Sequence, residues 1–215
     1  MTSVERLIIL QYTKIKDSAL VLHTLSRSQG RRSFVVHLGK GSSLALFQPL
    51  SLVEADVAPS LKSELARARA FSQVRPLISI RQEPYKNAIV LFMSEVLYRC
   101  IKDGMGDDAL FDWCERSIAT LEELRGDYSN FHLMFLLGLA AQLGFSPSAG
   151  DIAPFAGERF QDACRLLSLP YSEALMLPLS GERRSELCDV FLRYIAHHSE
   201  SALDIRSLAV LKEIL

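Results

Sequence analysis

The stretch Tyr85–Asp103, YKNAIVLFMSEVLYRCIKD, divides this chain into two parts with different hydrophobic patterns. Apolar side chains cover more than half of its helical wheel, which is far wider than the stripe of a surface helix. They are Ile89, Val90, Leu91, Phe92, Met93, Val96, Leu97 and Ile101. Before this stretch apolar residues recur in steps of two, and after it in steps of three and four. The pattern predicts a buried helix at the centre of a helical domain, with a small β domain before it.

The first part of the chain contains five candidate strands joined by short turns. They cover Arg6–Ile15, Ala19–Leu25, Ser33–Leu38, Phe47–Val57 and Glu64–Val74. The last is ambiguous because its alanines favour a helix. We read it as a strand because it closes a small barrel, an arrangement that removes exposed sheet edges. We therefore expect an α+β chain with a barrel domain at residues 1–80 and an all-α domain at residues 81–215.

Helix signals dominate the second part. Asp107 is a candidate N-cap for a helix through Leu124, and Gly144 is a natural end for a helix over Phe131–Leu143. The segment Phe145–Gly157 contains two prolines and two glycines, so we expect it to be irregular. Ser180 should begin a further long helix.

Composition describes an ordinary globular protein, with 49% hydrophobic and 23% charged residues. The longest apolar run, Leu133–Ala141, is about half of what a bilayer span needs. Glu5 and Arg6 interrupt the only early apolar run, so we expect no secretion signal and a cytoplasmic protein. The four cysteines are scattered without a CxxC pair, which favours reduced thiols and no metal site.

The formal net charge of −1 conceals a division along the chain. Residues 1–80 contain 11 Lys+Arg and 5 Asp+Glu, whereas residues 81–215 contain 13 and 20. A basic domain beside an acidic one indicates a polyanionic partner for the first, although the charges of two halves also differ by chance.

Motifs for catalysis are absent. Gly39-Lys40-Gly41-Ser42 lacks the first glycine and the Ser/Thr after Lys that a phosphate-binding loop requires. Adjacent residues such as His197 and His198 point in different directions on a helix, which makes a metal pair there unfavourable. His132 lies beside an apolar run, and we interpret it as a hydrogen-bonded boundary residue. We expect no enzyme activity and no cofactor.

The remaining chemical feature is a set of cations on the expected barrel. The predicted DNA-binding residues are Lys14, Lys16, Arg31, Arg32, Lys40, Arg67, Arg69 and Arg75. Barrels of this kind bind single strands by combining such charges with aromatic rings that stack on bases. The candidate rings are Tyr12, Phe34, Phe47 and Phe71, and each of them is also a candidate core residue. Any single cation could equally be an ordinary solvated side chain.

Five segments in order and spacing resemble the RecO family of bacterial recombination mediators. They are SALVLHTLSRSQGRRSFVVHLGKG, FQPLSLVEADV with its Gln48-Pro49 pair, IVLFMSEVLYRCI, FLLGLAAQLGFSPS and the C-terminal SLAVLKEIL. The resemblance implies an OB-fold domain followed by a helical domain. It also implies single-stranded DNA binding and annealing at the nucleoid, and a task shared with RecR in helping RecA replace single-strand binding protein (SSB). Arg31 matches the family's Gly-Arg turn, and Lys40 falls in its basic loop.

The chain also departs from the family pattern. The loop after Gly39 carries one Lys where relatives often have several, and His37 stands where Lys is frequent. Phe145–Arg165 contains only Cys164, so the zinc ribbon of many members should be missing. Near the family's site for the SSB tail, the usually basic positions are Leu133 and Met134.

Two questions therefore stay open at this level. The cation that would bind the SSB tail could be Arg99, Lys102 or Arg125. The shortened basic loop also favours a second hypothesis, an adaptor whose barrel mainly docks a partner such as RecR and binds DNA weakly.

Overall fold

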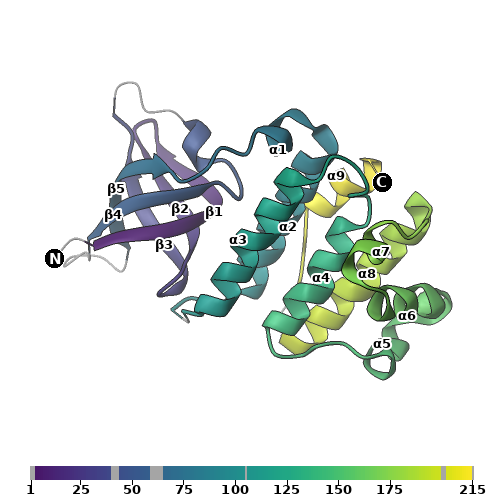
Figure 1. Cartoon of the computed structure of the whole chain (residues 1–215). Coiled ribbons are helices and arrows are strands. Elements are labelled where there is room, and N and C mark those ends of the chain that lie inside the picture. Colours follow the sequence, from purple (N-terminus) through teal and green to yellow (C-terminus); the bar gives the residue numbers. More distant parts are fainter. Residues whose placement is uncertain (1–2, 40–43, 59–64, 105, 200–201, 215) are drawn as a thin grey trace. The chain divides into compact units, whose positions relative to one another are not determined.

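The computed structural model describes residues 3–39, 44–58, 65–104, 106–199 and 202–214 (Figure 1). Strands occupy the first part and helices the second, so the expected α+β class is confirmed. The chain forms two compact units, Met1–Ile78 with Leu97–Ile118, and Ser79–Val96 with Ala119–Leu215. A boundary between domains at residue 80 stays a prediction.

Five strands form the barrel. They are β1 (Ser3–Lys16), β2 (Ala19–Ser26), β3 (Gly30–His37), β4 (Leu52–Ala58) and β5 (Ala66–Gln73). The strand order around the closed sheet is β1-β2-β3-β5-β4, and β3 and β5 are the parallel pair. This topology is that of an OB fold, as expected.

Alternate residues of the strands fill the barrel, because successive side chains in a strand point to opposite faces. The core includes Leu7, Ile9, Leu20, Leu22, Phe34, Val36, Val53, Ala55 and Val57. Ile8 and Leu25 are paired in the register and fully or almost fully buried, yet they lie outside this core cluster. The barrel is therefore buried on part of its outer face as well as inside.

The alanine-rich segment is the strand β5, against its local helix preference. Ala66 and Ala68 are buried in the barrel core, and Arg67 and Arg69 between and after them are exposed. These two alanines of β5 face the core of the closed sheet, so tertiary packing overrides helix propensity. The alternation ends at Ala70, which is exposed and has a φ of 55°.

The strand expected over Phe47–Val57 is shorter than predicted. A 3₁₀ helix, η1 (Leu44–Phe47), comes first, and the backbone N–H of Ser51 then bonds the carbonyl of Gln48 at 3.1 Å. Pro49 cannot donate a ladder hydrogen bond, and Leu50 has a φ of 58°, so a tight turn replaces the first part of the strand.

Nine helices lie in the described part of the chain. They are α1 (Ile78–Gln82), α2 (Pro84–Cys100), α3 (Asp108–Glu123), α4 (Phe131–Gln142), α5 (Ala149–Ala156), α6 (Phe160–Ser168), α7 (Tyr171–Leu175), α8 (Gly181–Ser199) and α9 (Ser207–Ile214). A short 3₁₀ segment, η2 (Gly157–Arg159), precedes α6. No helix of the described residues is long and apolar enough to cross a membrane.

Helix α2 is buried as predicted. Ile89, Val90, Phe92, Met93, Val96 and Leu97 are all 0% exposed, whereas Leu91 is 38% exposed. The helix limits also follow the sequence signals. The backbone N–H of Leu110 donates to Oδ1 of Asp107 at 3.0 Å, and Gly144 ends α4 with a φ of 92°.

The segment expected to be irregular, Phe145–Gly157, contains the helix α5, so that expectation is wrong. Ser148 and Asp151 form a capping box, in which each side chain bonds the other residue's backbone N–H. Pro154 is tolerated in the middle of this short helix. Helix α8 lies against both α4 and α5 in this unit.

Candidate nucleic-acid interface

Four of the predicted cations are exposed on two strands of the barrel, and we call them the basic rim. Its residues are Lys14 and Lys16 on β1 and Arg67 and Arg69 on β5. Lys16 pairs with Ala19 of β2, which pairs with His37 at the end of β3. Strand β5 runs parallel to β3 with Arg67 opposite Val35, so Arg69 lies near the level of His37. The two ends of the rim are three strand spacings apart, about 14 Å along the sheet.

The rim cations have no ion-pair partner within the described residues. Asp56 lies opposite Arg69 in the strand register without forming an ion pair. Side chains of this kind keep their charge and their hydrogen-bond donors available to an external anion. The rim residues are therefore exposed cations without a counterion among the described residues.

Arg31 and Arg32 lie elsewhere, at the start of β3. Six residues, about 20 Å of extended strand, separate Arg31 from His37. Nε of Arg31 donates to Oδ1 of Asp103 at 2.7 Å, and its guanidinium lies 4.8 Å from the ring centre of Tyr98. Nη1 of Arg32 lies 3.8 Å from Oε1 of Glu5. The structure thus gives these two arginines partners within the protein.

The last two predicted cations belong to neither group. Lys40 and the rest of its loop lie outside the described residues. Arg75 is half-buried after the end of β5 and has interactions of its own.

Most of the candidate stacking rings belong to the core. Phe34 is 0% exposed and Phe47 is 4% exposed. Phe71 packs edge-on against Phe47, with ring centres 4.9 Å apart. Tyr12, which precedes the rim lysines on β1, is 37% exposed and remains available to stack on a base.

Sequence reasoning missed two arginines that share the outer barrel surface with Arg31. Arg6 lies 3.4 Å from Glu115, and Arg27 pairs with Asp108 and Asp112. The acids stand on one stripe of α3, since their spacing of four and three residues repeats each helical turn. This spacing is visible in the sequence, but its partners on the barrel are not.

The Arg31 cluster also contains His23. Its Nδ1 is 2.8 Å from the hydroxyl of Ser33, and its ring packs against Tyr98 with centres 5.1 Å apart. Burial, and then the positive charge of Arg31, lowers the pKa of His23. His23 is therefore held towards its neutral form beside the arginine.

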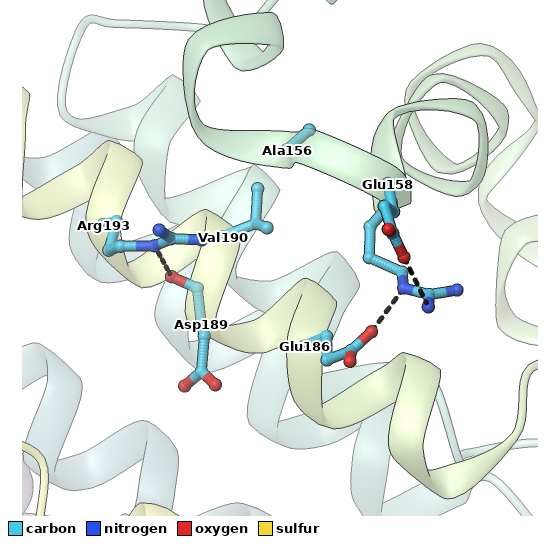
Figure 2. Close-up of a pocket in the computed structure, with 7 residues that line it drawn as sticks. Ala156, Glu158, Glu186, Asp189, Val190 and Arg193 are labelled. Carbon is cyan, nitrogen blue, oxygen red and sulfur yellow. Dashed lines mark hydrogen bonds and ion pairs between the residues drawn. The ribbon is translucent and has the colours of Figure 1, made fainter.

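The helical unit contains a polar groove of about 280 Å³ between α5 and α8 (Figure 2). Arg159 forms an ion pair with Glu186, whereas Nε of Arg193 donates to the backbone carbonyl of Asp189 at 3.3 Å and Nη2 to that of Phe155 at 3.0 Å. These contacts are ones that stabilise the packing of α8 against α5 and η2. Within the described residues no group of three or more His, Cys, Asp or Glu side chains could hold a metal ion.

Two ionisable side chains, Lys86 and His132, are buried inside the helical unit. Lys86 is 1% exposed, and its ammonium donates to the hydroxyl of Ser79 at 2.8 Å and to the carbonyl of Leu124. His132 is 0% exposed, so its expected position at a boundary is wrong. Burial, followed by the charge of Arg184, lowers the pKa of His132 to about 3. Neither group is placed to react with a substrate.

The fold defines the class of this protein as an OB-fold barrel with an appended α-helical region. Residues 81–151 match the family model described as recombination protein O C terminal. DNA repair protein RecO of Bacteroides fragilis is 30% identical over 233 residues, covering 96% of each chain. The RecO proteins of Phocaeicola vulgatus (30% over 180 residues, 82% of this chain and 75% of that one) and Porphyromonas gingivalis (32% over 163 residues, 72% and 66%) are also similar. The chain belongs to the RecO family.

Proposed function

We propose that this protein acts in DNA repair and recombination by binding and annealing single-stranded DNA, with the basic rim as its principal contact. Its relatives carry the name DNA repair protein RecO, which supports the general role. The observation that carries the DNA-binding part is the rim itself, four exposed cations without ion-pair partners among the described residues of an OB barrel.

The chemistry of the rim suits a polyanion without sequence preference. Lys and Arg side chains attract phosphates and release condensed counterions, which contributes affinity whatever the bases are. Contacts to phosphates leave the base edges free, so a second strand could pair with a strand held in this way. Tyr12 adds a ring on which one base could stack.

The proposed role is one of binding, without catalysis. Acting with RecR, the protein would help RecA load onto strands covered by SSB.

Fluorescence anisotropy with a labelled single-stranded oligonucleotide across a salt series tests the DNA-binding proposal. We expect tight binding at low salt, with a logarithmic slope that becomes shallower by about 0.7 for each rim cation removed. Arg67→Gln/Arg69→Gln and Lys14→Gln/Lys16→Gln should each weaken binding. Arg165→Gln/Arg206→Gln removes two exposed arginines of the helical unit and is the matched control.

The outcome separates the proposal from its alternatives. No binding by the wild type at low salt, or binding that is independent of salt, would contradict it. If the rim and control variants lose the same amount of affinity for DNA, net charge accounts for binding and the rim is not the DNA contact.

The adaptor function remains the second candidate, and the partners of Arg31 and Arg32 favour it. Because Asp103 and Glu5 already pair with these arginines, fewer barrel cations are available for DNA than the sequence suggests. Charge reversal at Arg31, Arg32, Arg67 and Arg69 distinguishes the two functions. If the folded variant still binds DNA but loses RecR in a pull-down, the adaptor function is the better description.

A further inference from the structure

Three arginines on the barrel face four carboxylates within the same compact unit. We call Arg6, Arg27 and Arg31 the arginine row. We call Asp103, Asp108, Asp112 and Glu115 the acidic stripe, which lies in the α2–α3 connection and on α3. Every arginine of the row has at least one carboxylate of the stripe within 4.0 Å, so the stripe neutralises much of the barrel's positive charge.

Water reaches these ion pairs. The side chains of Arg27 and Arg6 are 42% and 38% exposed, and those of Asp108 and Asp103 are 78% and 70% exposed. Ion pairs of this kind are weak and are screened by salt, so another anion can compete for the arginine.

The pairing also leaves donors of the arginines unmet. Each guanidinium has five N–H groups. Nε of Arg6 and Nε of Arg27 are buried and donate to no hydrogen-bond partner within the described residues. The acidic stripe therefore neutralises the charge of the arginine row but leaves some of its hydrogen-bond donors without an acceptor.

Aromatic rings orient two of the guanidinium groups independently of the carboxylates. The guanidinium of Arg27 lies 5.5 Å from the ring centre of Phe111, and that of Arg31 lies 4.8 Å from that of Tyr98. Loss of a carboxylate should consequently leave the arginines oriented, with their charge available to a new anion.

We propose that the acidic stripe is an intramolecular mimic of a phosphate backbone, which masks the arginine row as a second DNA-binding surface on the barrel. Single-stranded DNA that is already held on the rim would extend to the row by displacing Asp108 and Asp112 from Arg27. The stripe would thereby set the affinity and the length of strand bound. This inference rests on the proposed DNA-binding function.

The test is anisotropy with oligonucleotides, applied to the full-length Asp108→Asn/Asp112→Asn variant. Both substitutions keep the side-chain shape and remove the charges that face Arg27. We expect binding about fivefold tighter at low salt, since one charge-assisted contact is gained. The salt slope should be steeper by about 0.7, the value for one additional phosphate contact.

Two further variants make the result specific. Asp204→Asn/Glu213→Gln removes two exposed carboxylates from the other unit and should change affinity by much less. Adding Arg27→Gln to the stripe variant should abolish the gain. Thermal unfolding checks that each variant is folded, and Asp103→Asn, which removes the carboxylate beside Arg31, replaces the double variant if that one unfolds.

The outcomes are distinct. Failure of the wild type to bind at low salt refutes the proposed function. If the wild type binds and the stripe variant gains no more than the control, masking is wrong. A gain that persists after Arg27→Gln also overturns it, because the row would then not be the surface gained.

Discussion

A Cβ atom on Gly106 would lie 2.1 Å from the carbonyl oxygen of Ser28. The α2–α3 connection therefore approaches the backbone of the β2–β3 turn more closely than any other residue type allows. Asp103 of the same connection forms β-bridges with Gly30 and Arg31. A glycine is thus required where this connection meets the barrel.

Gly106→Ala should destabilise the protein, because the obstructing atoms belong to backbone and cannot rotate away. We expect a loss of about 1–3 kcal/mol in the free energy of unfolding, the range for overpacked sites. Urea unfolding measures it. Gly126→Ala is the control, since a Cβ there meets nothing within 4 Å. Equal stability of the two variants would contradict the close approach.

Because His132 is buried, we expect the stability of the protein to depend on pH in the acid range. Its pKa in the folded protein is lowered from 6.5 to about 3. Between these values the unfolded chain binds a proton that the folded protein does not, so the free energy of unfolding falls as the pH is lowered through this window. The maximum slope is about 1.4 kcal/mol per pH unit.

The difference between wild type and His132→Leu isolates this contribution from the carboxylates that titrate in the same range. We expect the variant to lose less stability than the wild type between pH 6.5 and 4 in urea melts. His37→Gln, at an exposed position, should keep the wild-type dependence. Parallel curves for wild type and His132→Leu would show that His132 is not buried in its neutral form.

Glu95 anchors the last helix. Its carboxylate accepts the backbone N–H groups of Arg206 at 3.1 Å and Ser207 at 2.8 Å, at the start of α9. A carboxylate at a helix N-terminus satisfies free N–H groups and interacts favourably with the helix dipole. Glu95→Ala should cost about 1 kcal/mol and speed hydrogen exchange in α9. Exchange in α9 should stay unchanged in Glu173→Gln, which alters an exposed carboxylate on α7. If Glu95→Ala also leaves the exchange rate unchanged, Glu95 does not anchor the helix.

We expect Tyr12 to contribute to DNA binding by stacking its ring on a base. Loss of one stacked base costs about 1–3 kcal/mol, so Tyr12→Ala should weaken oligonucleotide binding about fivefold or more. Tyr12→Trp should bind as well as wild type, because an indole also stacks. Tyr171→Ala removes an exposed ring from the helical unit and serves as the control. Equal affinity of Tyr12→Ala and wild type would place the bases elsewhere.

Alternation of apolar residues was sufficient to predict those barrel strands whose apolar side chains are buried. Alternation at Leu20, Leu22 and Phe34 predicts strands, and these side chains do fill the core. The alanines of β5 carry no such signal, and only the closure of the sheet favours a strand there. The helix α5 was missed because two prolines and two glycines outweighed the Ser148–Asp151 capping box.

The candidate site was only partly predictable. The sequence identifies eight cations of the barrel region, but the strand register places Arg31 about 13 Å of strand from the level of Arg67, the nearest rim residue. The acids that pair with Arg31 and Arg27 lie 72 and 85 positions away along the chain. No local pattern relates residues at such separations.

By itself the sequence determined the class of most segments, the wide apolar surface of α2 and the excess of positive charge before it, because periodicity and composition act over a few residues. Only the tertiary structure decided which of those charges face water and which meet a carboxylate. Ion pairing depends on distances of a few ångströms between residues far apart in the chain, and these distances exist only once the sheet has closed and the α2–α3 connection has packed against it.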